Sequence, residues 1–161
     1  MVQILAFEVS GSKNFTRNQL IRRTDKDKRT AMHKTCFYGN DGALRLILQK
    51  GEANVQDRRG ETPLHMAVIK NHQECIDVLL KHSADVNIED KAGWTALHFA
   101  CYKNRTALVQ ILIDANADVS LRNKENFSAL DIALIRGFHS SAALLYQAGG
   151  FVALFTLCLA F

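Results

Sequence analysis

Short apolar runs alternate with polar stretches along residues 25–150, in a pattern that favours helices. A first set of runs begins in each case with a hydroxyl residue, whose side-chain oxygen can accept a hydrogen bond from the exposed N–H groups of a helix start. Nine residues later comes Gly or Asn, the residue types that most readily adopt the left-handed conformation that ends a helix. The predicted starts and ends of these helices are Thr30 and Gly39, Thr62 and Asn71, Thr95 and Asn104, and Ser128 and Gly137.

A second helix is predicted after each of these, because another apolar cluster follows within a few residues. The clusters occupy residues 46–48, 78–80, 111–113 and 144–146, and the helices are predicted to end at Gly51, Ser83, Asn116 and Gly149. The polar stretches between the helix pairs contain Gly60, Gly93 and Asn126, which suit a turn that needs a positive φ. The pattern therefore predicts helix pairs joined by protruding turns or hairpins.

The predicted helix pairs repeat at a fixed period. Thr62, Thr95 and Ser128 are spaced by 33 residues, and Thr30 precedes Thr62 by 32. Such self-similarity is the signature of a stacked repeat protein. We assign four units, at residues 25–56, 57–89, 90–122 and 123–150, preceded by a basic leader at 1–24 and followed by an apolar tail at 151–161.

The segments DRRGETPLHMA and DKAGWTALHFA resemble the ankyrin-repeat pattern D-x-x-G-x-T-P-L-H-x-A. The resemblance implies an all-α ankyrin-repeat solenoid of stacked helix pairs with protruding β-turn or hairpin loops. The first and fourth units depart from the pattern at Lys28, Thr35, Asn123 and Asp131. Because a terminal repeat has a neighbour on one side alone, we interpret these departures as capping changes.

The composition indicates one globular domain with a core, since 48% of the 161 residues are hydrophobic and 22% are charged. The net charge of +4 belongs to the N-terminal segment: residues 1–29 contain seven Lys and Arg against three acids, and the remainder has thirteen of each. The basic segment RNQLIRRTDKDKR is either a nuclear-import or anionic-surface signal or, as the default, a solvated leader.

The four cysteines, at 36, 75, 101 and 158, form no CxxC pair, and MVQILAF lacks the basic start of a secretory signal. We therefore expect a reduced, intracellular protein, cytoplasmic or nuclear. The tail FVALFTLCLAF would span only about 16 Å as a helix, roughly half of a bilayer core, so no transmembrane span is expected. It is a hydrophobic cap, a tail that contacts a partner or membrane surface, or an alternative terminus of a longer chain.

His33 and Cys36, like His98 and Cys101, stand three residues apart, a spacing that would suit a metal or nucleophile site on a helix. The repeat register argues against such a site. The His position holds His33, His65, His98 and Asp131, and three residues later stand Cys36, Val68, Cys101 and Leu134. Because thiols interchange with hydrocarbons, we interpret Cys36 and Cys101 as buried apolar residues.

The ankyrin resemblance gives the histidines a structural role. It implies that His33, His65 and His98 bond the backbone of the neighbouring turn, supported by the hydroxyls of Thr30, Thr62 and Thr95. No GxSxG, GxxxxGK[ST], HExxH or paired CxxC motif is present. We therefore expect no catalytic, metal-binding or cofactor-binding residues, no small-molecule substrate, and a protein that is not an enzyme.

The resemblance also implies that a partner meets the turn tips and the exposed ends of the first helices, on the concave side of the stack. The tip positions are Lys26, Asp27, Arg29, Arg58, Arg59, Glu61, Lys91, Ala92, Trp94, Lys124, Glu125 and Phe127, and the helix positions are Phe37, Tyr38, Ile69, Lys70, Tyr102, Lys103, Ile135 and Arg136. These positions hold nine basic residues against three acidic ones and include the single Trp of the chain. Aromatic and Arg side chains are common anchors of protein interfaces.

We therefore expect a monomeric, non-catalytic module that binds an acidic, partly apolar protein segment around Trp94 and Tyr102, with Arg58, Arg59, Lys70 and Lys103 nearby. The simpler interpretation is that Trp94 and Phe127 cover neighbouring turns and that the basic residues are a solvated face. A scaffold subunit or an inhibitor of a larger complex is the nearest alternative function. Nucleic acid ranks lower as a ligand, because the repeats are neutral in total charge.

Overall fold

The computed structural model describes residues 23–48 and 53–149, which form eight helices in four consecutive pairs. The pairs are α2 (Ala31–Tyr38) with α3 (Asp41–Leu48), α4 (Pro63–Lys70) with α5 (Gln73–Lys81), α6 (Ala96–Tyr102) with α7 (Thr106–Asp114), and α8 (Ala129–Ile135) with α9 (His139–Gln147). The described residues contain no named strand, and an isolated antiparallel bridge joins Arg122 to Ser128. The predicted all-α repeat fold is confirmed.

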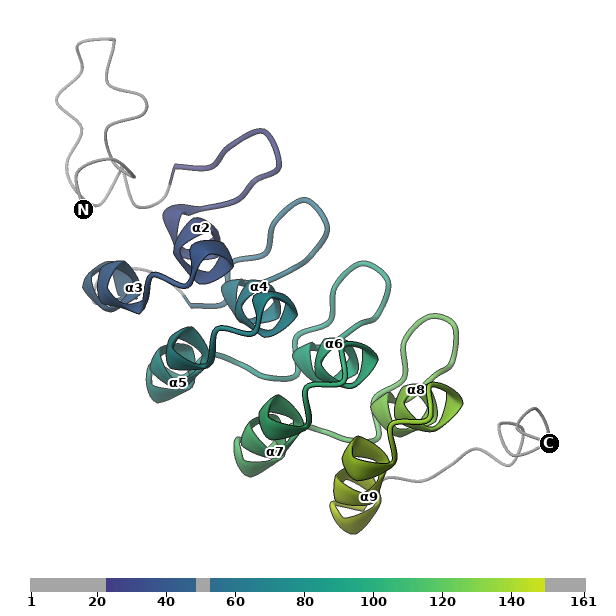
Figure 1. The fold of residues 1–161 in the computed structure, drawn as a ribbon. Coiled ribbons are helices and arrows are strands. Elements are labelled where there is room, and N and C mark those ends of the chain that lie inside the picture. Colours follow the sequence, from purple (N-terminus) through teal and green to yellow (C-terminus); the bar gives the residue numbers. More distant parts are fainter. Residues whose placement is uncertain (1–22, 49–52, 150–161) are drawn as a thin grey trace, which may run out of the picture.

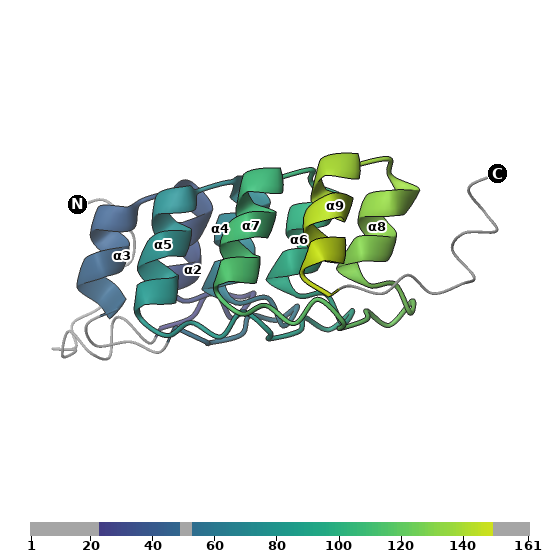
Figure 2. The same ribbon diagram turned by 90° about the horizontal axis from the view of Figure 1, so that it is seen from below.

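The helices stand in two rows (Figures 1 and 2). An inner row consists of α2, α4, α6 and α8, each in contact with the next, and an outer row consists of α3, α5, α7 and α9. The loops before the inner helices project beyond the inner row, so loops and inner helices share one side of the molecule (Figure 1). We call this side the inner-helix face.

Each inner helix begins where the sequence pattern predicts. Thr30, Thr62, Thr95 and Ser128 have an extended backbone at the N-cap and take part in a capping box with the residue three positions later. In a capping box two otherwise unpaired N–H groups are satisfied reciprocally by two side chains. The helices end before or at Gly39, Asn71, Asn104 and Gly137, all of which have a positive φ. Gly51 and the tail 151–161 lie outside the described residues, as does most of the leader 1–24.

The turns before the inner helices share one backbone conformation. Gly60 has φ 81°, and a Cβ added there would lie 2.9 Å from the backbone nitrogen of Lys91 in the next turn. Glycine is therefore required both by its φ and by the close approach of the neighbouring turn. Lys28 occupies the corresponding place in the first turn with φ 60°, a conformation that costs an L-residue free energy.

The core lies between the two rows and runs along the whole stack. Leu64, Leu97 and Leu130, at equivalent positions of three inner helices, are each buried, and Leu79 and Leu112 face them from the outer row. Every repeat thus buries its apolar face against its own second helix and against its neighbours, as expected for a stacked repeat. In the described part of the chain, no helix has the length and apolarity required to cross a membrane.

Candidate binding face on the inner helices

Two parallel rows of side chains run across the C-terminal ends of the inner helices. One row is apolar and the next is mainly basic, because the second, third and fourth repeats each place an apolar residue directly before a basic one. The first repeat has Tyr38 at the basic position. The apolar row is Phe37, Ile69, Tyr102 and Ile135, and the second row is Tyr38, Lys70, Lys103 and Arg136. Phe37 and Ile69 are half-buried, while the other members of both rows are exposed. The fold therefore presents apolar and cationic groups side by side along the stack.

The third and fourth repeats contribute a cluster centred on Tyr102. The Tyr102 ring meets the Trp94 ring edge-on at a centroid distance of 5.5 Å, and the Arg136 guanidinium carbon lies 4.3 Å from the centre of the Tyr102 ring. Lys103 lies on the same ring at 5.4 Å, and Phe99 supports Trp94 at 5.0 Å. A cation over an aromatic face is attracted by the ring's electron density, so the cluster is held together before any ligand binds.

A second, smaller cluster joins the first and second repeats. Phe37 and Tyr38 pack edge-on with ring centroids 5.1 Å apart, and the Lys70 ammonium lies 4.1 Å from the centre of the Phe37 ring. Lys70 was expected near Trp94 and Tyr102. In the structure its side chain reaches back to Phe37 of the preceding repeat, and the cations over the Tyr102 ring are Arg136 and Lys103.

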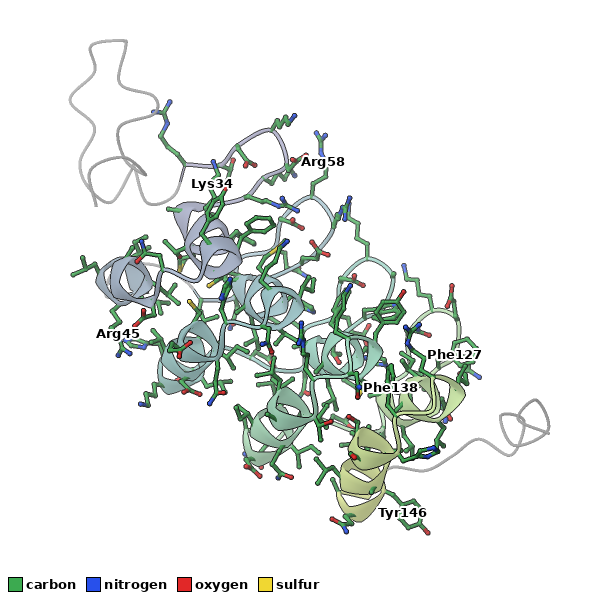
Figure 3. All side chains as sticks on the ribbon, in the orientation of Figure 1. Lys34, Arg45, Arg58, Phe127, Phe138 and Tyr146 are labelled. Atoms are coloured by element: carbon green, nitrogen blue, oxygen red, sulfur yellow. The ribbon has the colours of Figure 1, made fainter. Side chains whose placement is uncertain are left out.

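The turn tips form a backbone ladder that holds basic side chains in a row. The N–H of Arg58 donates to the carbonyl of Asp27, that of Lys91 to Arg59, and that of Lys124 to Ala92, at 2.7 to 3.0 Å. One exposed basic residue stands at the same place in every turn: Lys26, Arg58, Lys91 and Lys124. Arg58 extends outward from the tip of its loop (Figure 3). Because the ladder joins the backbones, the spacing of these charges is fixed by the fold.

Two acidic residues of the second turn, Asp57 and Glu61, are buried and stabilise the fold. The Asp57 carboxylate accepts hydrogen bonds from the N–H groups of Arg59 and Glu61 at 2.8 and 3.0 Å, and the Arg29 side chain pairs with it at 3.1 Å. Glu61, which the sequence analysis placed at an exposed tip, is buried beneath this arrangement. Burial, together with the charge of Asp57, raises the pKa of Glu61. The exposed side chains at the turn tips therefore carry a more positive net charge than a count of all acidic and basic tip residues suggests.

Most cations of the inner-helix face have no salt-bridge partner among the described residues; Arg29, which pairs with Asp57, is an exception. Within residues 23–48 and 53–149, no salt bridge involves the following side chains: Lys26, Arg58, Arg59, Lys70, Lys91, Lys103, Lys124 and Arg136. The outer helices carry four acids, Asp41, Glu74, Asp77 and Asp114, against two cations, Arg45 and Lys81. The two sides of the stack thus differ in charge.

Three histidines connect successive repeats beneath this face. The Nε2–H of His33, His65 and His98 donates to the backbone carbonyl of Glu61, Trp94 and Phe127, respectively, at 3.0 to 3.1 Å. Each Nδ1 accepts from the N–H of the Thr at the helix start and lies 2.8 to 2.9 Å from its hydroxyl oxygen. Burial lowers the pKa of all three rings. They therefore act as neutral connectors between repeats.

The cysteines of the described residues are buried. Cys36, Cys75 and Cys101 are 0% exposed, and burial raises the pKa of the Cys101 thiol to about 12. The neighbouring Cys75 sulfur and burial raise the pKa of Cys36 as well. Since the thiolate is the nucleophilic and metal-binding form, these environments disfavour both roles for Cys36 and Cys101. No group of three His, Cys, Asp or Glu side chains in residues 23–48 and 53–149 is arranged to hold a metal ion.

A family model for ankyrin repeats in three copies matches residues 2–90, and one for many copies matches residues 79–133. The chain belongs to the ankyrin-repeat family. Ankyrin repeats are generally protein–protein interaction modules, and the family is typically non-catalytic.

Ankyrin-containing relatives match part of the chain. Neurogenic locus notch homolog protein 1 is 40% identical over 67 residues in Xenopus laevis and 38% identical over 66 residues in Homo sapiens. The E3 ubiquitin-protein ligase KEG of Arabidopsis thaliana is 32% identical over 84 residues. The matches cover 41%, 40% and 51% of this chain and 3%, 3% and 5% of those proteins. The chain therefore spans only a small part of the length of each of these relatives.

The ankyrin fold brings together some of the predicted binding residues and separates others. Trp94, Tyr102, Lys103 and Arg136 form one cluster, whereas Phe37, Tyr38 and Lys70 form another. Arg58, Arg59 and Lys91 stand at turn tips, and Ile69 and Phe127 are half-buried between repeats. The sequence analysis did not single out Phe99 or Phe138. Their signal was available, since Phe99 lies three residues before Tyr102 on the same helix and Phe138 follows Arg136 by two residues.

Proposed function

We propose that the inner-helix face binds an acidic, partly apolar segment of another protein. The observation that carries this proposal is the Tyr102 cluster: exposed Tyr102 lies between Trp94 and Arg136, beside the exposed ammonium of Lys103. Trp, Tyr and Arg are the residue types most often found at the energetic centres of protein interfaces. Because neighbouring contacts already hold these side chains, binding would require little further ordering of them.

The charge of the face supports the acidic character of the partner. Apart from Arg29, the cations named above for this face are not engaged in salt bridges within the described residues, so a carboxylate that binds them breaks no internal ion pair. The apolar row between the basic tips and the second row supports a segment that also carries apolar side chains. Complementary charge of this kind steers association and weakens with salt.

A comparison of variants tests this proposal. A partner captured from cell extract with the wild-type chain is titrated against Trp94→Ala/Tyr102→Ala and against a matched control, Leu46→Ala/Gln110→Ala, on the outer helices. We expect the first variant to bind at least about tenfold more weakly, a loss of ~1.4 kcal/mol, and the control to bind as wild type does. Equal affinity of all three proteins for the partner would exclude this face.

The charge component is tested separately with Lys103→Glu/Arg136→Glu. We expect weaker binding and a smaller dependence of the affinity on salt concentration, because two cations that face the acidic segment are inverted. A single-stranded oligonucleotide serves as the competing ligand. Tighter binding of the oligonucleotide than of the captured protein would favour nucleic-acid recognition instead.

We infer an intracellular setting, cytoplasmic or nuclear, in which the chain acts as a binding subunit, or as a scaffold or inhibitor within a larger complex. The three buried cysteines of the described residues are unpaired, which supports a reducing compartment. Fluorescent tagging of the full chain, with and without Arg22→Ala/Arg23→Ala, tests nuclear import. Nuclear accumulation that the substitution abolishes would support an import signal, and a diffuse wild-type protein would exclude it.

A further inference from the structure

The last repeat leaves an apolar position uncovered that the other repeats bury. Leu134 on α8 is 39% exposed, whereas Cys36, Val68 and Cys101, at the same place in the three preceding inner helices, are 0% exposed. Each of those three inner helices packs against the inner helix of a following repeat, which α8 lacks among the described residues. The exposed Leu134 therefore marks surface of the kind that each repeat normally buries against its successor.

The outer row shows the same contrast. Tyr146 on α9 is 70% exposed and points away from the rest of the stack (Figure 3). Its equivalents are Leu48, which is buried, and Leu80 and Ile113, which are half-buried and packed against the core. We call the surface around Leu134 and Tyr146 the end face.

The fourth repeat has, in place of the His that bonds the following repeat, an Asp that contacts Arg122 at the end of the third unit and Ser128 of its own unit. Where the other repeats have His, Asp131 accepts hydrogen bonds from the Arg122 side chain at 2.8 Å and from the N–H of Ser128 at 3.0 Å. His98, by contrast, donates to the carbonyl of Phe127 in the next turn. A carboxylate cannot donate to a carbonyl, so Asp131 does not offer a fifth repeat the bond that the histidines offer their neighbours.

A strongly apolar segment follows directly on this end of the stack. Helix α9 ends at Gln147, and residues 151–161, FVALFTLCLAF, contain no charged residue and only one polar residue, Thr156. A segment tethered a few residues from a surface has a high effective concentration there, so it competes well with any separate molecule. Burial of its side chains against Leu134 and Tyr146 removes apolar surface of both from water.

We propose that residues 151–161 pack on the end face, around Leu134 and Tyr146. This surface lies at the end of the stack, apart from the Tyr102 cluster, so the proposal does not depend on the proposed function. It assigns the apolar tail an intramolecular role among the three possibilities that the sequence leaves open.

The thiol of Cys158 tests the proposal in the full chain. Because Cys36, Cys75 and Cys101 are 0% exposed, a water-soluble thiol reagent added to the folded protein reports on Cys158. We expect Cys158 to react at least about tenfold more slowly than in the urea-unfolded chain, and Leu134→Asp/Tyr146→Asp to restore most of the fast rate. Leu46→Asp, at an exposed Leu of α3, is the control and should leave the rate slow.

Fast reaction of Cys158 in the wild-type protein, or a slow rate that Leu134→Asp/Tyr146→Asp does not change, would overturn the proposal. Removal of residues 151–161 gives a second measurement, for which we expect the Tm to fall by about 5 °C. An unchanged Tm would count against packing on the end face. Protection of Cys158 that is lost on dilution would assign the tail to a second copy of the chain. Protection that requires phosphatidylcholine vesicles would assign the tail to a membrane surface. Either result would also overturn the proposal.

Discussion

The imidazole of His65 donates a hydrogen bond from Nε2 to the backbone carbonyl of Trp94, 3.1 Å away in the next repeat. Its Nδ1 accepts from the N–H of Thr62 at 3.0 Å, which fixes the proton of the neutral ring on Nε2. The same connection occurs at His33 and His98. Because Trp94 also belongs to the Tyr102 cluster, the buried His65 helps to position a residue of the candidate binding face.

The first prediction concerns pH. Burial lowers the pKa of His33, His65 and His98 below the ordinary value, so the unfolded chain binds more protons than the folded one below about pH 6.5. The free energy of unfolding should therefore fall as the pH drops from 7.5 to 5. The loss is about 1.4 kcal/mol per pH unit for each ring that is protonated in the unfolded chain but neutral in the folded one. The raised pKa of Glu61 offsets a part of this loss.

Thermal unfolding across this pH range measures the effect. His65→Gln removes one titrating ring and should reduce the slope of Tm against pH, whereas the exposed control His139→Gln should keep the wild-type slope. A Tm that is constant from pH 7.5 to pH 5 would show that the buried rings do not resist protonation.

The second prediction concerns the helix caps. Thr62→Ala removes the hydroxyl that accepts from the N–H of His65 and supports its ring, so the free energy of unfolding should fall by about 1 to 2 kcal/mol. Thr62→Ser keeps the hydroxyl and should retain most of the stability. Urea unfolding followed by Trp94 fluorescence measures both, and equal losses for Ala and Ser would rule out the hydroxyl as the cause.

The third prediction compares two glycines. Gly60→Ala adds a Cβ to a residue whose φ is 81°, and this Cβ would lie 2.9 Å from the backbone nitrogen of Lys91. The substitution should therefore destabilise the protein by more than about 2 kcal/mol. Gly42→Ala, in helix α3, meets its nearest neighbouring atom at 3.8 Å and should stabilise by up to about 1 kcal/mol. Similar effects of the two changes on the midpoint of urea unfolding would contradict the geometry of the turn.

The fourth prediction compares two ion pairs. Arg122→Ala removes the cation that donates to the buried carboxylate of Asp131, so we expect a loss of about 2 to 3 kcal/mol. Arg45→Ala breaks the exposed pair with Asp41, in which the side chains are 55% and 40% exposed, and should cost less than about 1 kcal/mol. Equal losses in chemical denaturation would mean that burial of Asp131 contributes nothing.

Local chemistry explains what could be predicted about the helices. The ends of α4 follow from Thr62 and Asn71, since a cap and a left-handed residue act on backbone groups within one turn of themselves. The left-handed conformation of Gly93 likewise follows from a turn of a few residues. The period of 33 residues then orders these elements along the stack.

The positions of Glu61 and Lys70 could not be predicted in this way. Glu61 is buried at a place where Arg29 of the preceding repeat reaches to 3.8 Å from its carboxylate. Lys70 lies on Phe37 because the first two inner helices pack side by side. Both outcomes depend on which side chains of adjacent repeats meet, and a repeat pattern fixes only that they are neighbours.

By itself, the sequence determined the ankyrin fold, the helix starts and ends, and the structural place of the histidines, because each depends on local hydrogen bonding or on the period. Only the tertiary structure decided which cation covers Tyr102, which turn acids are buried, and that Leu134 and Tyr146 are left uncovered at the end of the stack. These are relations between repeats, set by side-chain packing across distances that no local pattern encodes.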